Sequence, residues 1–207
     1  DVTPGDPGDV IAEFPWQAET IDLAVAAAKR GFRTWRHTSL EERAELLQKY
    51  ATALKKHHER LAQAISREMG KVLWEARGEV NGMIAKVGIT LNESMRLVQD
   101  WQPEGVQGWL RYRPRGVMAV IGPFNFPGHL PNGHIVPAIA TGNTVIFKPA
   151  SHCPAVGQIM AECFHEAGFP DGVFNLVQIP GRYCDDLVLH KDVDGVLFTG
   201  STGIGMR

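Results

Sequence analysis

Short apolar runs that alternate with helical patterns are the feature that most constrains the fold of this chain. After residue 116, four runs rich in β-branched residues occur, at Val117 to Ile121, Thr144 to Phe147, Val173 to Val177 and Val193 to Phe198. Helical patterns separate them, near Pro131 to Ala140, Pro154 to Ala167 and Arg182 to His190. This strand–helix–strand order predicts a mostly parallel sheet with right-handed crossover connections.

The first half of the chain is predicted to be helical and to cover this sheet. Ser39-Leu-Glu-Glu42 fits a capping box, which would open one long helix that Gly70 ends as a left-handed cap residue. Before it, Thr20 can cap a helix whose apolar residues recur at three-to-four spacing. After it, a third helical stretch runs roughly from Val72 to Val98. The prediction is therefore an α/β fold with N-terminal helices packed on a parallel sheet.

One segment between the two halves has a different pattern. Trp109-Leu-Arg-Tyr-Arg113 alternates apolar and basic residues after the Pro- and Gly-containing stretch from Gln102 to Gly108. Alternation of this kind predicts an exposed strand. We therefore expect an arm-like strand near residues 109–115.

Composition narrows the classes of function. The chain has 207 residues and a formal net charge of -2, with no basic stripe and no apolar run that approaches the roughly 20 residues needed to cross a bilayer. Nucleic acid and membrane are therefore not expected as partners. Three cysteines without CxxC spacing predict neither a disulfide framework nor a metal site. The first residues lack the charged and apolar regions of a signal peptide, so a cytoplasmic location is expected.

The ends of the predicted strands carry the polar residues of greatest interest. Ligands bind beyond the carboxyl ends of the strands of an open parallel sheet. Asn125 lies in the stiff turn Gly122-Pro-Phe-Asn-Phe-Pro127, Lys148 ends the second strand, and Gly200-Ser201 follow the last one. Because the strands are parallel, these three connections are expected to meet at one crevice.

Each of these signals is ambiguous when taken alone. An amide in a stiff turn can donate to a developing oxyanion, but an Asn near Gly and Pro more often satisfies its own turn. Lys148 can reach ribose hydroxyls or a phosphate, or it can be a surface lysine whose stem covers apolar surface. The glycines from Gly200 to Gly205 allow a phosphate to approach, but they read G-x-x-G-x-G and also suit tight packing alone.

The three motifs together resemble the aldehyde dehydrogenase superfamily. Val117 to Pro127, Phe147-Lys148-Pro149-Ala150 and Phe198-Thr-Gly-Ser201 occur in the family's order, and the resemblance extends from about Gly8 over nearly the whole chain. Phe124 to Ala138 looks most like the succinylglutamate semialdehyde dehydrogenase branch of arginine catabolism. The resemblance implies a Rossmann-like sheet and a homo-oligomer in which residues 102–116 form an oligomerisation arm.

The resemblance also implies a reaction and a set of site residues. Asn125 would bind the oxyanion that forms when a cysteine thiolate attacks an aldehyde, for example a semialdehyde such as succinylglutamate semialdehyde. Hydride would pass to NAD or NADP, and water would hydrolyse the thioester. The residues implied in cofactor binding are Phe124, Lys148, Ser151, Gly200, Ser201 and Gly205.

Two departures from the family pattern modify these expectations. Where NAD-preferring relatives carry a glutamate three residues after the lysine, this chain has Ser151. A carboxylate would repel a 2′-phosphate, whereas a hydroxyl can donate to it, so NADP is predicted to be tolerated or preferred. In addition, Ile179-Pro180-Gly181 displaces glycines expected after Gln178.

The resemblance places the family's catalytic cysteine, in a Gly-Gln-x-Cys motif, and its catalytic glutamate, in Glu-Leu-Gly-Gly, C-terminal to the glycine motif. Neither of these two motifs occurs in residues 1–207. None of Cys153, Cys163 and Cys184 has the setting of a nucleophile. Residues 1–207 are therefore expected to be the NAD(P)-binding domain truncated before the catalytic domain, and to be inactive alone. Two alternatives remain at this point, a non-catalytic nucleotide-binding or interaction module and a relative of the acyl-phosphate reductases.

Overall fold

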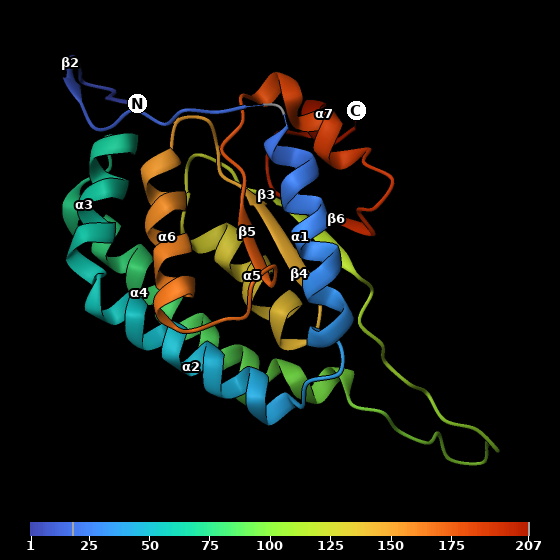
Figure 1. Ribbon diagram of the computed structural model, residues 1–207. Helices are drawn as coiled ribbons and strands as arrows, with labels where there is room; N and C mark the ends of the chain where they lie inside the picture. Colours follow the sequence, from blue (N-terminus) through green and yellow to red (C-terminus); the bar gives the residue numbers. More distant parts are fainter. Residues whose placement is uncertain (18, 207) are drawn as a thin grey trace.

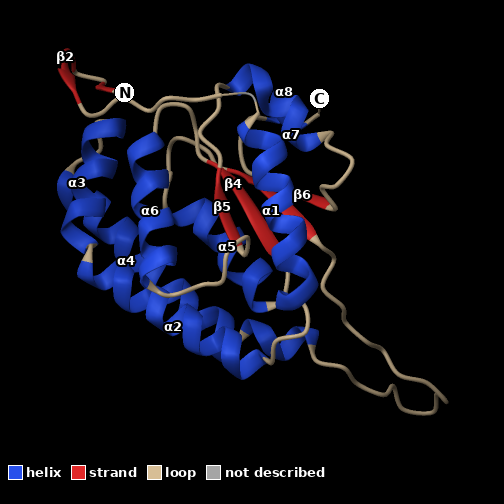
Figure 2. Ribbon diagram, viewed as in Figure 1, coloured by secondary structure: helices blue, strands red, loops and turns tan. Residues whose placement is uncertain are grey.

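A computed structural model describes residues 1–17 and 19–206 of the chain. Its centre is a four-stranded sheet in the order β5-β4-β3-β6, in which every neighbouring pair is parallel (Figure 2). The strands are β3 (Val117–Ile121), β4 (Thr144–Lys148), β5 (Phe174–Leu176) and β6 (Gly195–Phe198). The predicted α/β fold with a parallel sheet is therefore confirmed.

The two central strands are buried along their length because helices cover both of their faces. Every residue of β3 and β4 is buried. Along β3, Val117, Ala119 and Ile121 pack into one apolar cluster, and Met118 and Val120 pack into the other. This alternation follows from the two-residue period of a strand, and burial on both faces explains the uninterrupted apolar runs.

One face of the sheet is covered by α1 (Thr20–Trp35) and the short α7 (Cys184–Val188), whose apolar side chains share one cluster with the sheet. The opposite face is covered first by α5 (His129–Ala140) and α6 (Pro154–Glu166). Behind them lie α2 (Leu40–Lys56), α3 (His58–Met69) and α4 (Leu73–Asn92), so these three helices form an outer layer (Figure 1).

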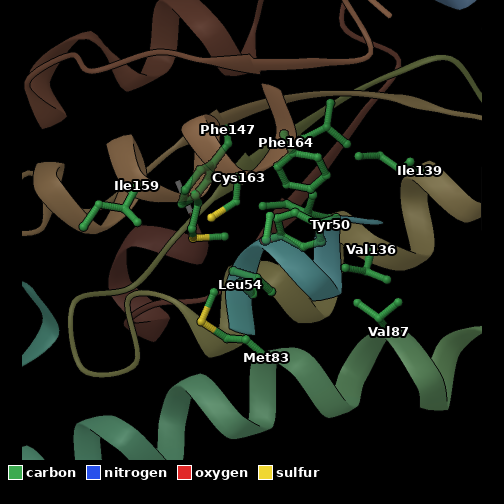
Figure 3. Packing of buried hydrophobic residues seen from close by; sticks show 14 of the residues in the cluster. Tyr50, Leu54, Met83, Val87, Val136, Ile139, Phe147, Ile159, Cys163 and Phe164 are labelled. Carbon is green, nitrogen blue, oxygen red and sulfur yellow. The ribbon is translucent and has the colours of Figure 1, made fainter. Parts of the chain in front are cut away.

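The larger core lies between this outer layer and the sheet. Tyr50 of α2 stacks on Phe164 of α6 with ring centroids 3.9 Å apart, and Phe164 stacks in turn on Phe174 of β5 at 4.2 Å. Figure 3 shows Tyr50 and Phe164 beside Leu54, Met83 and other side chains of this cluster. The aromatic stack connects the outer helices to the sheet through α6.

The local helix signals are partly confirmed. Ser39 and Glu42 form the predicted capping box, and Gly70 has the predicted left-handed conformation, with φ 65°. The prediction of a single long helix between them is wrong. Two helices, α2 and α3, meet at His57, whose backbone (φ -94°, ψ 15°) leaves the helical region. Thr20 is the first helical residue of α1 and not its N-cap. Glu19 is the N-cap residue, and its side chain makes no capping hydrogen bond.

The third helical stretch ends its regular α-helix at Asn92, and a 3₁₀ helix, η1 (Ser94–Val98), follows. The predicted helix near 182–190 is shorter and is preceded by a 3₁₀ turn, η2 (Gly181–Tyr183). Two short elements were not predicted, the antiparallel pair β1 (Val2–Thr3) and β2 (Asp6–Val10).

None of the helices in residues 1–17 and 19–206 combines the length and apolar character needed to span a bilayer.

The predicted strand near 109–115 is wrong for this chain. Within the described residues, the segment between η1 and β3 forms only a single antiparallel bridge, Trp101 to Leu110, and extends away from the body (Figure 1). A two-stranded ribbon without a sheet to join is marginally stable, which explains why the alternating pattern does not form a strand here. Trp109 remains 60% exposed.

Candidate functional site

The parallel sheet brings the three predicted connections to one edge. The N–H of Gly122, just after β3, donates to the carbonyl of Lys148 at the end of β4 (3.0 Å). On the other side, the N–H of Thr199, just after β6, donates to the carbonyl of Ile121 (3.3 Å). The Asn125 turn thus lies between the lysine strand and the glycine turn, as the topology predicted.

The side chain of His134 adds a contact across this edge. Its Nε2 lies 3.0 Å from Oγ1 of Thr199, which connects α5 to the residue before Gly200. Burial lowers the pKa of His134, and the ammonium of Lys86 lowers it further, so the neutral ring is favoured. Sequence reasoning had no local signal for this pairing, because the two residues lie 65 positions apart.

The turn itself exposes the side chain of Asn125. The backbone carbonyl of Asn125 accepts a hydrogen bond from Nζ of Lys71 (2.9 Å), and the same ammonium lies 4.0 Å from the ring centroid of Phe126. Within residues 1–17 and 19–206, the side-chain amide of Asn125 makes no hydrogen bond. Its N–H groups are therefore available to a bound oxygen, while its backbone is fixed.

A buried carboxylate supports this turn from the helical layer. The side chain of Glu79 on α4 is fully buried and pairs with Nζ of Lys71 at 2.6 Å. It also accepts the backbone N–H groups of Gly128 (2.9 Å) and His129 (3.1 Å) at the start of α5. Sequence reasoning missed this residue, although a carboxylate among the buried positions Ala76, Val80 and Met83 of one helix was a signal that could have found it.

A second buried carboxylate does the same for the helix that follows β4. Glu68, at the end of α3, accepts the N–H groups of Ala155 (2.6 Å) and Val156 (3.0 Å) at the start of α6. Burial raises the pKa of Glu68 to about 7, against the lowering effect of these two donors. The helices that follow β3 and β4 are therefore both capped by glutamates from the outer helical layer.

Lys148 is more enclosed than its position at a strand end suggested. The residue is 4% exposed, and its Nζ donates to the carbonyl of Pro149 (3.0 Å). Burial lowers the pKa of Lys148, and the neighbouring thiol of Cys184 acts in the opposite direction. A contact of this ammonium with a ribose remains a prediction.

Ser151 is exposed at the rim of a groove of about 210 Å³. The groove lies between two proline-bearing turns, and its lining includes Trp16, Pro149, Pro154, Gln178, Ile179 and Pro180. The polar lining residues are Asp1, Ser151 and Gln178. Apolar walls with a few polar groups suit a purine nucleoside, whose flat face is apolar and whose ribose is polar. The residues present therefore fit the nucleoside part of a dinucleotide.

The glycine turn has a packing role that the sequence left open. A Cβ on Gly200 would clash with the ring of Phe198, and a Cβ on Gly205 would lie 3.1 Å from the same ring. Ser201 precedes the short α8 (Thr202–Gly205) as its N-cap residue, without a side-chain hydrogen bond. A side chain at Gly200 would therefore require the ring of Phe198, which is 36% exposed, to move. Phosphate binding at Gly200, Ser201 and Gly205 remains a prediction.

No thiol of the described residues lies in an activating environment. Cys153 and Cys163 are buried, and burial raises their pKa values, to about 12 for Cys163. Burial also raises the pKa of Cys184, although the Lys148 ammonium opposes this effect. Thiolate is therefore scarce at all three positions near neutral pH, which agrees with the expectation that none of them is a nucleophile.

Comparison with known proteins identifies the family of this chain. The sequence profile of the aldehyde dehydrogenase family matches residues 1–207. The chain belongs to the aldehyde dehydrogenase family. It is 46% identical over 200 residues to the N-succinylglutamate 5-semialdehyde dehydrogenase of Burkholderia lata, an alignment that covers 93% of this chain and 41% of that protein. The Burkholderia cenocepacia protein of the same name is 46% identical over 197 residues, covering 92% and 40%.

Solved structures of the family superimpose closely. The NADP-dependent glyceraldehyde-3-phosphate dehydrogenase of Bacillus halodurans, complexed with NADP, has a TM-score of 0.92 and 31% identity, covering 100% of this chain and 45% of that one. The 1-pyrroline-5-carboxylate dehydrogenase of Thermus with bound NAD has a TM-score of 0.91 and 33% identity, covering 99% and 41%. The chain thus spans about two fifths of the length of the curated relatives.

Proposed function

We propose that the protein carrying this chain oxidises an aldehyde to the carboxylic acid with NAD or NADP as hydride acceptor. The observation that carries this proposal is the fixed Asn125 turn, whose free side-chain amide lies between the lysine strand and the glycine turn in a chain of this family. The names of the curated relatives favour a semialdehyde such as N-succinylglutamate 5-semialdehyde as substrate.

In this proposal each part of the chain has a separate task. Asn125 donates an N–H to the aldehyde oxygen as negative charge develops on it, and its fixed backbone limits the reorganisation that this requires. The attacking cysteine lies outside residues 1–207. The nicotinamide cofactor, when bound, accepts the hydride. Ser151 and the groove beside it hold the adenosine part, with Phe124, Lys148, Gly200, Ser201 and Gly205 as further cofactor-binding residues.

Residues 1–207 then constitute the NAD(P)-binding domain, and residues 102–116 form the oligomerisation arm. Support for the arm is the projecting segment itself, in which Trp109 and Leu110 are 60% and 41% exposed. Sedimentation of a Trp109→Ser, Leu110→Ser double variant tests this assignment. A lower oligomeric mass is expected, and an unchanged mass would contradict the arm's role.

The activity is tested by mixing purified intact protein with N-succinylglutamate 5-semialdehyde and NAD or NADP and following NAD(P)H. Aldehyde-dependent NAD(P)H formation is expected, and residues 1–207 expressed alone should show none, because none of their thiols is activated. Formation of NAD(P)H by residues 1–207 alone would refute the assignment of the nucleophile to another part of the protein.

A further inference from the structure

We propose that Lys71 and Glu79 are positioning residues, which hold the Asn125 turn in the geometry that oxyanion stabilisation requires. This inference rests on the proposed function for its chemistry. The pair comes from the helical half of the chain, and the turn comes from the sheet half, so the two residues act across the interface between the layers.

The carboxylate of Glu79 joins three donors at one buried point. One oxygen accepts the N–H groups of Gly128 and His129, and the other accepts Nζ of Lys71. Gly128 packs closely against α4 at this point, because a Cβ there would lie 2.6 Å from Sδ of Met83. Any shift of the segment after Asn125 would therefore break charge-assisted hydrogen bonds to a carboxylate whose side chain is fully buried.

Lys71 extends this hold to the Asn125 residue itself. Its ammonium donates to the Asn125 carbonyl and lies over the ring of Phe126, so it fixes the peptide group that follows the catalytic amide. The Lys71 side chain is 13% exposed. A cation near an aromatic face in a partly desolvated site is held more firmly than one on the surface.

Comparison with Glu68 separates this role from simple helix capping. Glu68 caps α6 with two backbone bonds, and within the described residues no lysine forms an ion pair with it, although the N-terminal ammonium lowers its pKa. Capping therefore does not require a paired lysine. The additional contacts of Lys71, to the Asn125 carbonyl and the Phe126 ring, both lie in the turn.

Stability alone also does not account for a buried ion pair. Desolvation offsets much of the attraction, and replacement of such pairs by apolar residues is often neutral or stabilising. What a buried pair does enforce is one arrangement of its partners, because any other arrangement leaves a charge unpaired. Here the enforced arrangement is that of the segment from Asn125 to His129.

The experiment compares Lys71→Met, Glu79→Gln and the conservative Lys71→Arg in the intact protein. The matched control is Lys56→Met, which removes an ammonium paired with Glu166 at 2.7 Å on the surface, with the lysine side chain 64% exposed. For each protein, kcat, the KM for aldehyde and the Kd for the cofactor are measured. Amide hydrogen exchange of residues 124–130 is measured beside that of the start of α6 as an internal reference.

Lys71→Met and Glu79→Gln are expected to lower kcat about tenfold or more, since misplacing a catalytic group by about 1 Å has effects of this size or larger. Cofactor Kd should change less than about twofold, and exchange should accelerate in residues 124–130 without acceleration at α6. Lys71→Arg should recover most of kcat, and Lys56→Met should change nothing, as exposed pairs contribute little.

Unchanged kcat in Lys71→Met, or exchange that accelerates equally at α6, would overturn the positioning role. An unmodified protein that forms no NAD(P)H from any aldehyde would contradict the proposed function instead. Even then, amide exchange that accelerates only in residues 124–130 of Lys71→Met and Glu79→Gln would show that the two residues hold the turn in place.

Discussion

Single residues at the strand ends differ in how their surroundings constrain them. Lys148 is 4% exposed and bonded to its own chain, whereas Ser151, three residues later, faces a groove. The sequence allowed both residue types to be identified as candidate ligands, since each follows an apolar strand. It did not predict their different exposure, because exposure depends on elements that pack from elsewhere in the chain.

Ser151 is the residue at which cofactor choice is expected to change. Ser151→Glu should weaken NADP binding relative to NAD at least about tenfold, because a carboxylate repels the 2′-phosphate. Comparison of the two dissociation constants by titration checks this, with Ser151→Ala as the control that removes the hydroxyl without adding charge. At least tenfold tighter binding of NAD than NADP by the unmodified protein would contradict the predicted tolerance of NADP.

Helices and strands were predictable where the signal is local. The capping box at Ser39 and the left-handed Gly70 depend on residues within one turn, and both are confirmed. The division at His57 was missed, since neither Gly nor Pro marks it. Glu68 and Glu79 were missed because their partners lie 87 and 49 residues away in sequence, and no local pattern reports such pairs.

Glu68, which caps α6, makes the free energy of unfolding depend on pH. The pKa of Glu68 is raised from 4.5 to about 7 in the folded state, mainly by burial. Folding therefore favours the protonated acid, and this contribution to stability is complete below pH 4.5 and is lost as the pH rises through about 7. Linkage makes the total change about 3 kcal/mol in the free energy of unfolding.

Glu68→Gln should remove this dependence, because an amide does not titrate. Urea unfolding at several pH values between 4 and 8 measures the difference in free energy of unfolding between the unmodified protein and the variant. That difference should change in favour of the variant as the pH rises. A difference that stays constant across this range would show that Glu68 does not titrate between 4.5 and about 7.

At the scale of the whole molecule, topology was the most predictable property. Alternating β-branched runs and helical patterns determine a parallel sheet, and a parallel sheet brings the strand ends together whatever the detailed packing. The arm was predicted as a strand and is not one here, since pairing depends on a partner strand rather than on the alternation near Trp109. The glycine turn was ambiguous in sequence, and in the structure a Cβ at Gly200 would displace the exposed ring of Phe198.

If the Asn125 side chain donates to the oxyanion, as proposed here, its removal in an Asn125→Ala variant of the intact protein should change kcat more than any other property. Asn92→Ala, on an exposed asparagine at the end of α4, is the matched control. Loss of one such donor is expected to lower kcat by about 100-fold or more, with KM and thermal stability nearly unchanged and the control fully active. A decrease of less than about threefold in kcat would contradict the claim.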